Sequence, residues 1–110
     1  MRYLILSLLL MANASYAATA SWYGIPFHGR LTASGERFNM NDLTCASNTH
    51  KIGTKLKVTN KSNGKSVVVR VNDTGGFKKY GRTLDLSRGA FNKIEDINKG
   101  LVKINIQVLK

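Results

Sequence analysis

Residues 55–71 read KLKVTNKSNGKSVVVRV, and this stretch decides the fold. Residues 55–59 alternate polar and apolar side chains, which is the pattern of a strand with one buried face. Residues 66–71 are mostly β-branched and apolar, which favours a more central strand. Between them, the pair Asn63-Gly64 supplies residues that tolerate positive φ, as a tight hairpin turn requires. We therefore predict a β-hairpin in the middle of the chain.

A further strand signal lies near the end of the sequence. Residues 102–108 place four apolar side chains on one face and polar side chains on the other. One short helix is predicted after Ser87, which can act as its N-cap. Its apolar stripe consists of Leu86, Ala90, Phe91 and Ile94. Glycines precede and separate the predicted strands, so the spacing indicates an all-β fold, a small barrel or sandwich with one short helix.

The length and composition exclude several classes of protein. A chain of 110 residues allows one domain, and a hydrophobic fraction of 43% is enough for a packed core. One cysteine cannot form an intramolecular disulfide, and one cysteine with two histidines cannot make a four-ligand zinc site. No glycine-rich phosphate-binding motif is present. We expect no metal and no cofactor.

The first seventeen residues, MRYLILSLLLMANASYA, have the features of a secretory signal peptide. Arg2 precedes a short apolar run, and Ser15 and Ala17 are small residues placed to allow cleavage after Ala17. The apolar run is shorter than the ~20 residues that span a bilayer. We therefore expect a signal peptide at 1–17 and a mature domain at 18–110, secreted across the inner membrane into the periplasm or cell envelope.

Charge and cysteine use bear on the partners of the mature chain. Cys45, the only cysteine, lies far beyond the cut, so we expect no lipid anchor, no stable membrane insertion and a soluble product. The net charge is +11, and the basic residues are scattered rather than gathered in a tail. In an exported protein this charge favours anionic envelope polymers, although a solvated surface that maintains solubility explains it equally well. Export argues against nucleic acid as a partner.

Six carboxylates are available to an acid/base enzyme: Glu36, Asp42, Asp73, Asp85, Glu95 and Asp96. Asp73 ends the most apolar strand and precedes a turn that contains two glycines. Partial burial there suits a carboxyl group to donate a proton near neutral pH, but Asp73 can equally bond the backbone of its own turn. Asp85, between two leucines, is either a second acid or a buried structural carboxylate.

Two other features have both a structural and a functional interpretation. Cys45 follows Leu43 at strand spacing, which favours a small core residue over a nucleophile. The aromatic residues near the start of the mature chain can form a sugar-stacking wall or contribute to the core. They are Trp22, Tyr23, Phe27 and Phe38.

Five segments, in order along the chain, resemble the rare lipoprotein A family. They are ASWYG at 20–24, FHGRLTASGE at 27–36, GTKLKVTN at 53–60, NGKSVVVRVND at 63–73 and GRTLDLS at 81–87. Together they cover essentially the whole mature chain. The resemblance implies a six-stranded double-psi β-barrel with one or two short helices, in a minimal form without the glycan-binding repeat domain that many members carry at the carboxyl end.

The resemblance also implies an activity. Members of the family are lytic transglycosylases, which cleave peptidoglycan glycan strands, preferably strands without stem peptides, during cell wall organisation and cell separation. An acid protonates the β-1,4 glycosidic oxygen between N-acetylmuramic acid and N-acetylglucosamine, and the muramoyl C6 hydroxyl attacks its own anomeric carbon to leave a 1,6-anhydro end. Because this nucleophile is intramolecular, no second carboxylate has to activate a water. We therefore expect an enzyme that acts as a monomer on peptidoglycan.

The family's functional residues carry over to matching positions. Its catalytic aspartate falls on Asp73, its supporting glutamate on Glu36, and its active-site histidine position holds Ser47. Asp85 matches the acid that related double-psi barrels place beside the groove. The resemblance implies that five residues bind substrate: Trp22, Tyr23, His28, Thr32 and Asp85.

Two departures from the family pattern affect these expectations. Ser47 cannot take up a proton near neutral pH as imidazole does, and Thr74 replaces the usual arginine after Asp73. We expect Ser47 to face the groove and bond substrate or Asp73, and His50 to be peripheral, because residues three apart in a strand point to opposite faces. The alternative function is a non-catalytic, expansin-like module that binds peptidoglycan.

Overall fold

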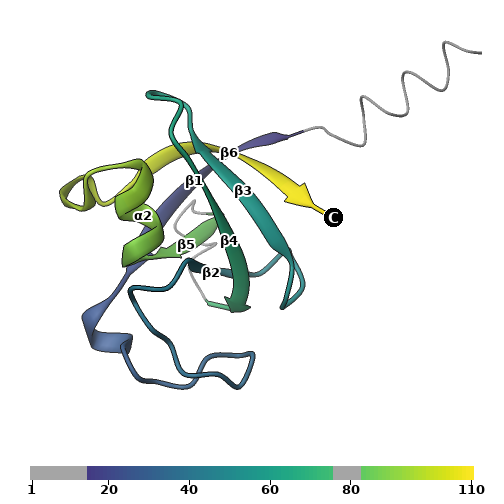
Figure 1. The fold of residues 1–110 in the computed structure, drawn as a ribbon, viewed down its shortest axis with the longest axis vertical. Helices are drawn as coiled ribbons and strands as arrows, with labels where there is room; N and C mark the ends of the chain where they lie inside the picture. The colour runs from purple at the N-terminus through teal and green to yellow at the C-terminus, as the bar shows by residue number, and fades with distance from the viewer. Residues whose placement is uncertain (1–14, 76–82) are drawn as a thin grey trace, which may run out of the picture.

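The computed structural model describes residues 15–75 and 83–110, and in them six strands close into a barrel (Figure 1). The strands are β1 (Tyr16–Tyr23), β2 (Thr44–Ser47), β3 (Lys55–Asn60), β4 (Ser66–Asp73), β5 (Leu84–Ser87) and β6 (Val102–Leu109). Around the barrel their order is β1-β5-β2-β4-β3-β6. One α-helix, α2 (Arg88–Ile94), and two short 3₁₀ helices, η1 (Ile25–Phe27) and η3 (Ile97–Lys99), complete the described part. The predicted six-stranded, mainly-β barrel is confirmed.

The predicted central hairpin is also confirmed. β3 and β4 pair antiparallel, with Lys55 opposite Arg70 and Thr59 opposite Ser66. The turn differs from the expectation, because Gly64 has a φ of +77° while Asn63 does not have a positive φ. The Asn63 amide instead donates to the carbonyl of Ile94 at 3.0 Å and accepts from the Lys65 amide at 2.9 Å. Asn63 thus ties the hairpin turn to the end of α2.

Two parallel strand pairs, β1 with β5 and β2 with β4, distinguish this barrel from a simple meander. The register of β2 against β4 shifts between Cys45 and Ala46, since Cys45 pairs with Val71 and Ala46 pairs with Asp73. Asn72 is therefore the extra residue of a β-bulge, a feature that re-aims side chains. It lies directly before the candidate acid.

The barrel core follows the predicted alternation. In β6, Val102, Ile104 and Ile106 are buried, but Val108, expected on the same face, is 45% exposed near the end of the strand. Cys45 is fully buried, as expected of a core residue, and burial together with the charge of Asp85 raises the pKa of its thiol to about 12. This thiol is protonated at neutral pH and is not a nucleophile.

The predicted helix cap is present at the start of α2. The Ser87 hydroxyl accepts a hydrogen bond from the Ala90 amide at 3.1 Å and donates one to the carbonyl of Asp42 at 2.5 Å. A Cβ added to Gly89 would lie 2.7 Å from the carbonyl oxygen of Asn41, so only glycine permits this close approach. The beginning of α2 is therefore fixed against the loop that precedes β2.

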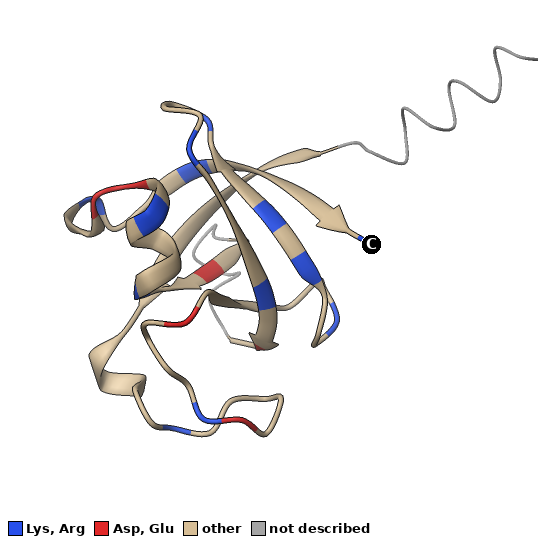
Figure 2. Ribbon diagram, in the orientation of Figure 1, with Lys and Arg blue, Asp and Glu red and all other residues tan. Residues whose placement is uncertain are grey.

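The predicted signal peptide lies mostly outside the described residues, which begin at residue 15. Within them, β1 starts at Tyr16, so cleavage after Ala17 would remove the first two residues of that strand, which pair with β6. No helix in residues 15–75 and 83–110 is long and apolar enough to cross a membrane. In Figure 2, Lys and Arg residues are found on β3, β4 and α2 and in loops between the elements.

Candidate functional site

Asp73, at the end of β4, is held by two separate segments. Its Oδ1 accepts hydrogen bonds from the backbone amides of Thr74 at 2.9 Å and Ala33 at 3.0 Å. The Tyr23 hydroxyl donates to the other oxygen, Oδ2, at 3.4 Å. Asp73 therefore does bond its own turn, and it also receives contacts from β1 and from the loop after η1. Its Oδ2 makes only one long contact within the described part of the chain.

Tyr23 stands in an aromatic cluster that fixes its ring. The ring stacks on Phe38 with centroids 4.2 Å apart and meets the edge of Phe27 at 5.7 Å. Burial, followed by the negative charges of Asp73 and Asp85, raises the pKa of Tyr23 well above its usual value. Tyr23 is thus a neutral phenol that donates its proton toward Asp73.

Glu36 is bound as an ionised carboxylate. Arg70 donates to both of its oxygens, at 2.7 and 3.2 Å, and the Asn72 amide donates to Oε1 at 2.9 Å. These hydrogen bonds, that from Arg70 first, lower the pKa of Glu36. A carboxylate that is ionised at neutral pH cannot act as a proton donor, so Glu36 supplies negative charge next to Asn72, the residue that precedes Asp73.

Thr32 and His28, both expected to bind substrate, contribute to the loop between η1 and β2. The Thr32 hydroxyl is nearly buried and donates to the carbonyl of Glu36 at 2.8 Å, which closes the loop that carries Glu36. The exposed His28 accepts from the Met40 amide through Nδ1 at 3.2 Å. Direct contact of either side chain with substrate stays a prediction.

Ser47, expected to bond substrate or Asp73, instead bonds the backbone of the turn that follows β2. It is 1% exposed, and its Oγ accepts hydrogen bonds from the amides of Thr49 at 3.2 Å and His50 at 3.1 Å. Within the described residues no hydrogen bond joins it to Asp73. The short hydroxyl side chain prefers nearby backbone donors, as serine often does in turns. Ser47 can therefore support the site only by shaping the turn that follows β2.

Asn48 connects that turn to the segment after Asp73, and sequence reasoning missed it. Its amide nitrogen donates to the carbonyl of Gly75, and its oxygen accepts from the Gly75 amide at 3.1 Å. The side chain thus imitates a backbone pairing partner. The only signal in the sequence was an asparagine in a predicted loop, which does not identify its partner 27 residues later.

The contacts of the His50 ring are made away from Asp73. Its Nε2 lies 2.5 Å from the hydroxyl of Tyr16, and burial lowers the pKa of its imidazole. Within residues 15–75 and 83–110, no hydrogen bond joins this ring to Asp73. The expectation that His50 is peripheral agrees with this arrangement.

Asp85 shares a row with Asp73 across the barrel. Ser21 pairs with Asp85, Asp85 with Ala46, and Ala46 with Asp73, so one residue from each of four strands lies in the row. The backbones of Asp73 and Asp85 are two strand spacings apart, which is roughly 10 Å. Ser21 donates to Asp85 at 2.9 Å, which satisfies one of its oxygens.

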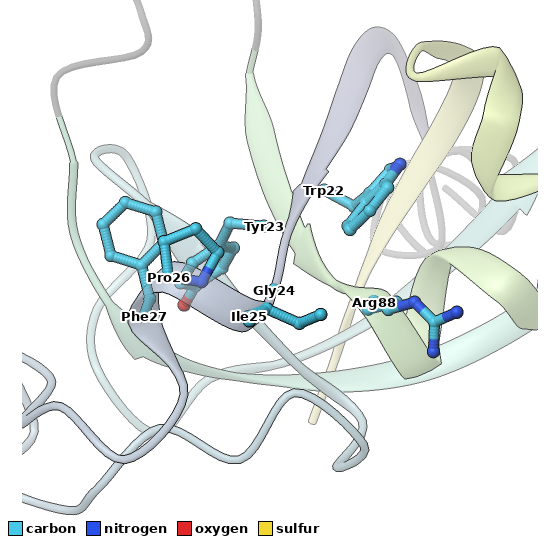
Figure 3. Close-up of a pocket in the computed structure, with 7 residues that line it drawn as sticks. All are labelled: Trp22, Tyr23, Gly24, Ile25, Pro26, Phe27 and Arg88. Atoms are coloured by element: carbon cyan, nitrogen blue, oxygen red, sulfur yellow. The ribbon is translucent and has the colours of Figure 1, made fainter.

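An apolar pocket adjoins Tyr23 on the side of η1 and has a volume of about 410 Å³ (Figure 3). It is lined by Trp22, Tyr23, Gly24, Ile25, Pro26, Phe27 and Arg88. Trp22 donates from its indole nitrogen to the carbonyl of Ile97 at 2.9 Å and packs against Phe91. The aromatic residues therefore belong both to the packed structure and to a hollow that sugar rings can enter.

No group of three His, Cys, Asp or Glu side chains in the described segments is placed to hold a metal ion. Asp73, Tyr23 and the ionised Glu36 supply acid–base and charged groups to the site. Together they can protonate a leaving oxygen and stabilise positive charge on a neighbouring carbon.

Comparison with known sequences gives matches over most of the chain. The family model described as lytic transglycolase matches residues 15–106. A Synechocystis RlpA protein is 52% identical over 91 residues, 83% of this chain and 28% of the relative. Proteins named endolytic peptidoglycan transglycosylase RlpA are 49% identical in Vibrio cholerae, over 82% of this chain and 34% of the relative, and 44% identical in Neisseria meningitidis, over 88% and 40%. The chain thus spans well under half the length of these relatives.

Solved structures share the barrel. A Clavibacter michiganensis expansin variant in complex with cellohexaose has a TM-score of 0.70 at 22% identity, over 88% of this chain and 51% of that one. The Streptomyces papain inhibitor also has a TM-score of 0.70, at 21% identity, over 88% of this chain and 96% of that one. At this level of identity the likeness shows the fold, a double-psi β-barrel, and nothing about activity.

Proposed function

This chain belongs to the rare lipoprotein A family of lytic transglycosylases, and we propose that it is itself a lytic transglycosylase that cleaves peptidoglycan glycan strands. The observation that supports this most directly is the placement of Asp73, whose Oδ2 accepts from the hydroxyl of Tyr23, a residue of both the aromatic cluster and the pocket lining. The matched residues, 15–106, include Asp73, Glu36 and the pocket.

The reaction begins with proton transfer from Asp73. Its carboxyl group protonates the glycosidic oxygen between N-acetylmuramic acid and N-acetylglucosamine, and the bond from that oxygen to the muramoyl anomeric carbon breaks. The C6 hydroxyl of the same muramoyl residue forms a new bond to the anomeric carbon. Its proton passes to the Asp73 carboxylate, which restores the acid. No water is consumed, and the products are a 1,6-anhydromuramoyl end and a free N-acetylglucosamine 4-hydroxyl.

The two carboxyl oxygens of Asp73 have different contacts and therefore different proposed roles. Oδ1 accepts from two backbone amides, of Ala33 and Thr74, which orient the carboxyl group. Oδ2 faces the Tyr23 hydroxyl at 3.4 Å, a distance that leaves it available to a substrate oxygen. We assign Oδ2 as the oxygen that transfers the proton.

Glu36 supports the same step electrostatically. Positive charge develops on the anomeric carbon as the glycosidic bond lengthens, and a fixed negative charge nearby stabilises it. Arg70 and Asn72 hold Glu36 ionised and in one position. Ser47 supports the site through the turn that its hydroxyl organises.

From the sequence and the family we also infer the substrate, the cellular role and the location of the protein. The substrate strands lack stem peptides, and the reaction serves cell wall organisation and cell separation. Residues 1–17 direct secretion across the inner membrane and are removed, and the domain at 18–110 acts as a monomer in the periplasm or envelope. Trp22, Tyr23, His28, Thr32 and Asp85 border the bound glycan.

The test is the chemistry of the products. Purified glycan strands are incubated with the protein and with Asp73→Asn, and the ends are analysed by mass spectrometry. Anhydromuramoyl ends that require Asp73 support the proposal, whereas reducing ends would indicate a hydrolase. Binding without any fragments would favour the second candidate, an expansin-like glycan-binding module. One observation favours that candidate: within the described residues no imidazole contacts Asp73.

A further inference from the structure

Arg88 lies at a hollow in the surface, and its contacts differ from those of three other arginines. Arg70 is paired with Glu36, Arg37 donates to the carbonyl of Gly29, and Arg30 lies over the ring of Phe27. For Arg88, no ion pair or hydrogen bond of its guanidinium is found within the described part of the chain. Its side chain lines the pocket next to Tyr23. An unpaired cation beside an apolar hollow is suited to an anionic ligand.

The backbone holds Arg88 at a fixed place relative to the candidate acid. β1 and β5 pair in parallel with Tyr23 opposite Ser87, so Arg88 is the next residue after a register partner of Tyr23. A Cβ built on Gly24 would lie 3.7 Å from the Cβ of Arg88. Tyr23 in turn reaches Asp73 with its hydroxyl. A ligand that fills the pocket therefore contacts both Arg88 and Tyr23, the residue that reaches the candidate acid.

Figure 3 shows that the residues lining the pocket lie toward two ends of it. Pro26 and Phe27 lie at one end, Trp22 and Arg88 lie at the other, and Ile25 projects between them. One end thus presents apolar rings, and the other presents an indole and a cation. Such a site favours a ligand with a short apolar part next to a carboxylate over a neutral sugar alone.

We propose that Arg88 is a specificity-determining residue that pairs with the free lactyl carboxylate of a muramic acid residue bound over this pocket. The inference rests on the proposed function, which supplies muramic acid as part of the substrate. The lactyl group carries a methyl group next to its carboxyl group, which matches an apolar pocket with a cation at its end. When a stem peptide is attached, the carboxyl group becomes an amide and its charge is lost, so Arg88 discriminates against peptide-bearing residues.

Trp22 provides the readout for a binding test, because it is the only tryptophan and it lines the pocket. The ligand is the disaccharide N-acetylglucosaminyl-N-acetylmuramic acid, which lacks the bond that the enzyme is proposed to cut. The protein is titrated with this disaccharide and, separately, with the disaccharide whose lactyl carboxyl group is converted to a methylamide, and Trp22 fluorescence is followed in both titrations. We expect the free acid to bind roughly threefold to tenfold more tightly, the range of a charge-assisted contact at a partly exposed site.

Variants of Arg88 test whether the preference for the free acid over the methylamide depends on this side chain. Arg88→Gln keeps the length of the side chain and removes its charge, so the two ligands should bind equally, while Arg88→Lys should retain part of the preference. Lys93→Gln, which removes a charge from the same helix, is the matched control and should leave the preference unchanged. Equal binding of both ligands to the parent protein, no binding of either, or an unchanged preference in Arg88→Gln would overturn the proposal.

Two further ligands separate this inference from its alternatives. A disaccharide that carries a stem peptide has a carboxylate at the peptide terminus; if it binds as tightly as the free acid through Arg88, the lactyl assignment is wrong. Full-length strands test the activity separately. A lactyl preference that depends on Arg88 without any anhydromuramoyl product would overturn the proposed transglycosylase and leave this inference standing.

Discussion

The hydroxyl of Tyr23 lies 3.4 Å from Oδ2 of Asp73, and this contact joins the aromatic cluster on β1 to the carboxyl group at the end of β4. The two residues are fifty positions apart in the sequence. Because Tyr23 stacks on Phe38, its hydroxyl has little freedom to move away from the acid. The pair is therefore a fixed feature of the site rather than a surface contact.

The first prediction concerns Tyr23→Phe. The ring and its stacking remain, but the donor to Oδ2 is lost, so we expect the rate of glycan cleavage to fall roughly threefold to tenfold, as the loss of one hydrogen bond does. The rate of anhydromuramoyl release is the measurement. Thr59→Val, which removes a hydroxyl from β3 next to the hairpin turn, is the control and should cleave at the parental rate. Equal loss in both variants would mean that the Tyr23 hydroxyl has no special role.

The second prediction concerns the pH dependence of stability. The ion pair with Arg70 lowers the pKa of Glu36 in the folded state, so its contribution is present above the unfolded-state pKa and is lost as the pH falls through the folded-state value. We expect Glu36→Gln to lower the free energy of unfolding by about 0.5–1 kcal/mol at pH 7, as for an exposed pair. Urea denaturation at pH 7 and near pH 3 should show the difference shrinking at the lower pH; a constant difference would contradict it.

The third prediction concerns the clamp between Asn48 and Gly75. Asn48→Ala removes both hydrogen bonds to the segment that follows Asp73, so we expect kcat to fall roughly tenfold while KM changes little. Asn63→Ala, which removes a similar side-chain bridge at the opposite hairpin turn, is the matched control. It should lower stability without lowering kcat. A parallel loss of kcat in both variants would show a general structural effect.

The fourth prediction separates Ser47 from His50. Ser47→Ala removes the acceptor of two turn amides, so the free energy of unfolding should fall by about 1 kcal/mol and cleavage should weaken. His50→Ala should leave the rate of anhydromuramoyl release nearly unchanged, since no hydrogen bond joins its ring to Asp73 in the described part of the chain. Loss of activity in His50→Ala alone would reverse the assignment and make His50 the functional imidazole.

Local sequence patterns were sufficient for the barrel strands and the helix cap. The alternation in residues 55–59 and 102–108 and the Ser87 cap depend on neighbours in the chain, and the structure contains all three. The Val108 side chain is the exception, because alternation does not show where a strand leaves the core.

The details of the site depended on pairings between distant segments. The β-bulge at Asn72 arises from the register of β2 against β4, which no local pattern specifies. The inward orientation of Ser47 and the bridge from Asn48 to Gly75 depend on the same packing. For Asp73, sequence reasoning identified the residue and its two possible roles, and the contact with Tyr23 required the fold.

The most direct test of the central claim is the yield of anhydromuramoyl ends from purified glycan strands with the parent protein and Asp73→Asn. The amide keeps the shape of the side chain but cannot supply an acidic proton. We predict that release falls by roughly 10²-fold or more while the strands still bind. Release at the parental rate from Asp73→Asn would contradict the account and make Asp85 the candidate acid.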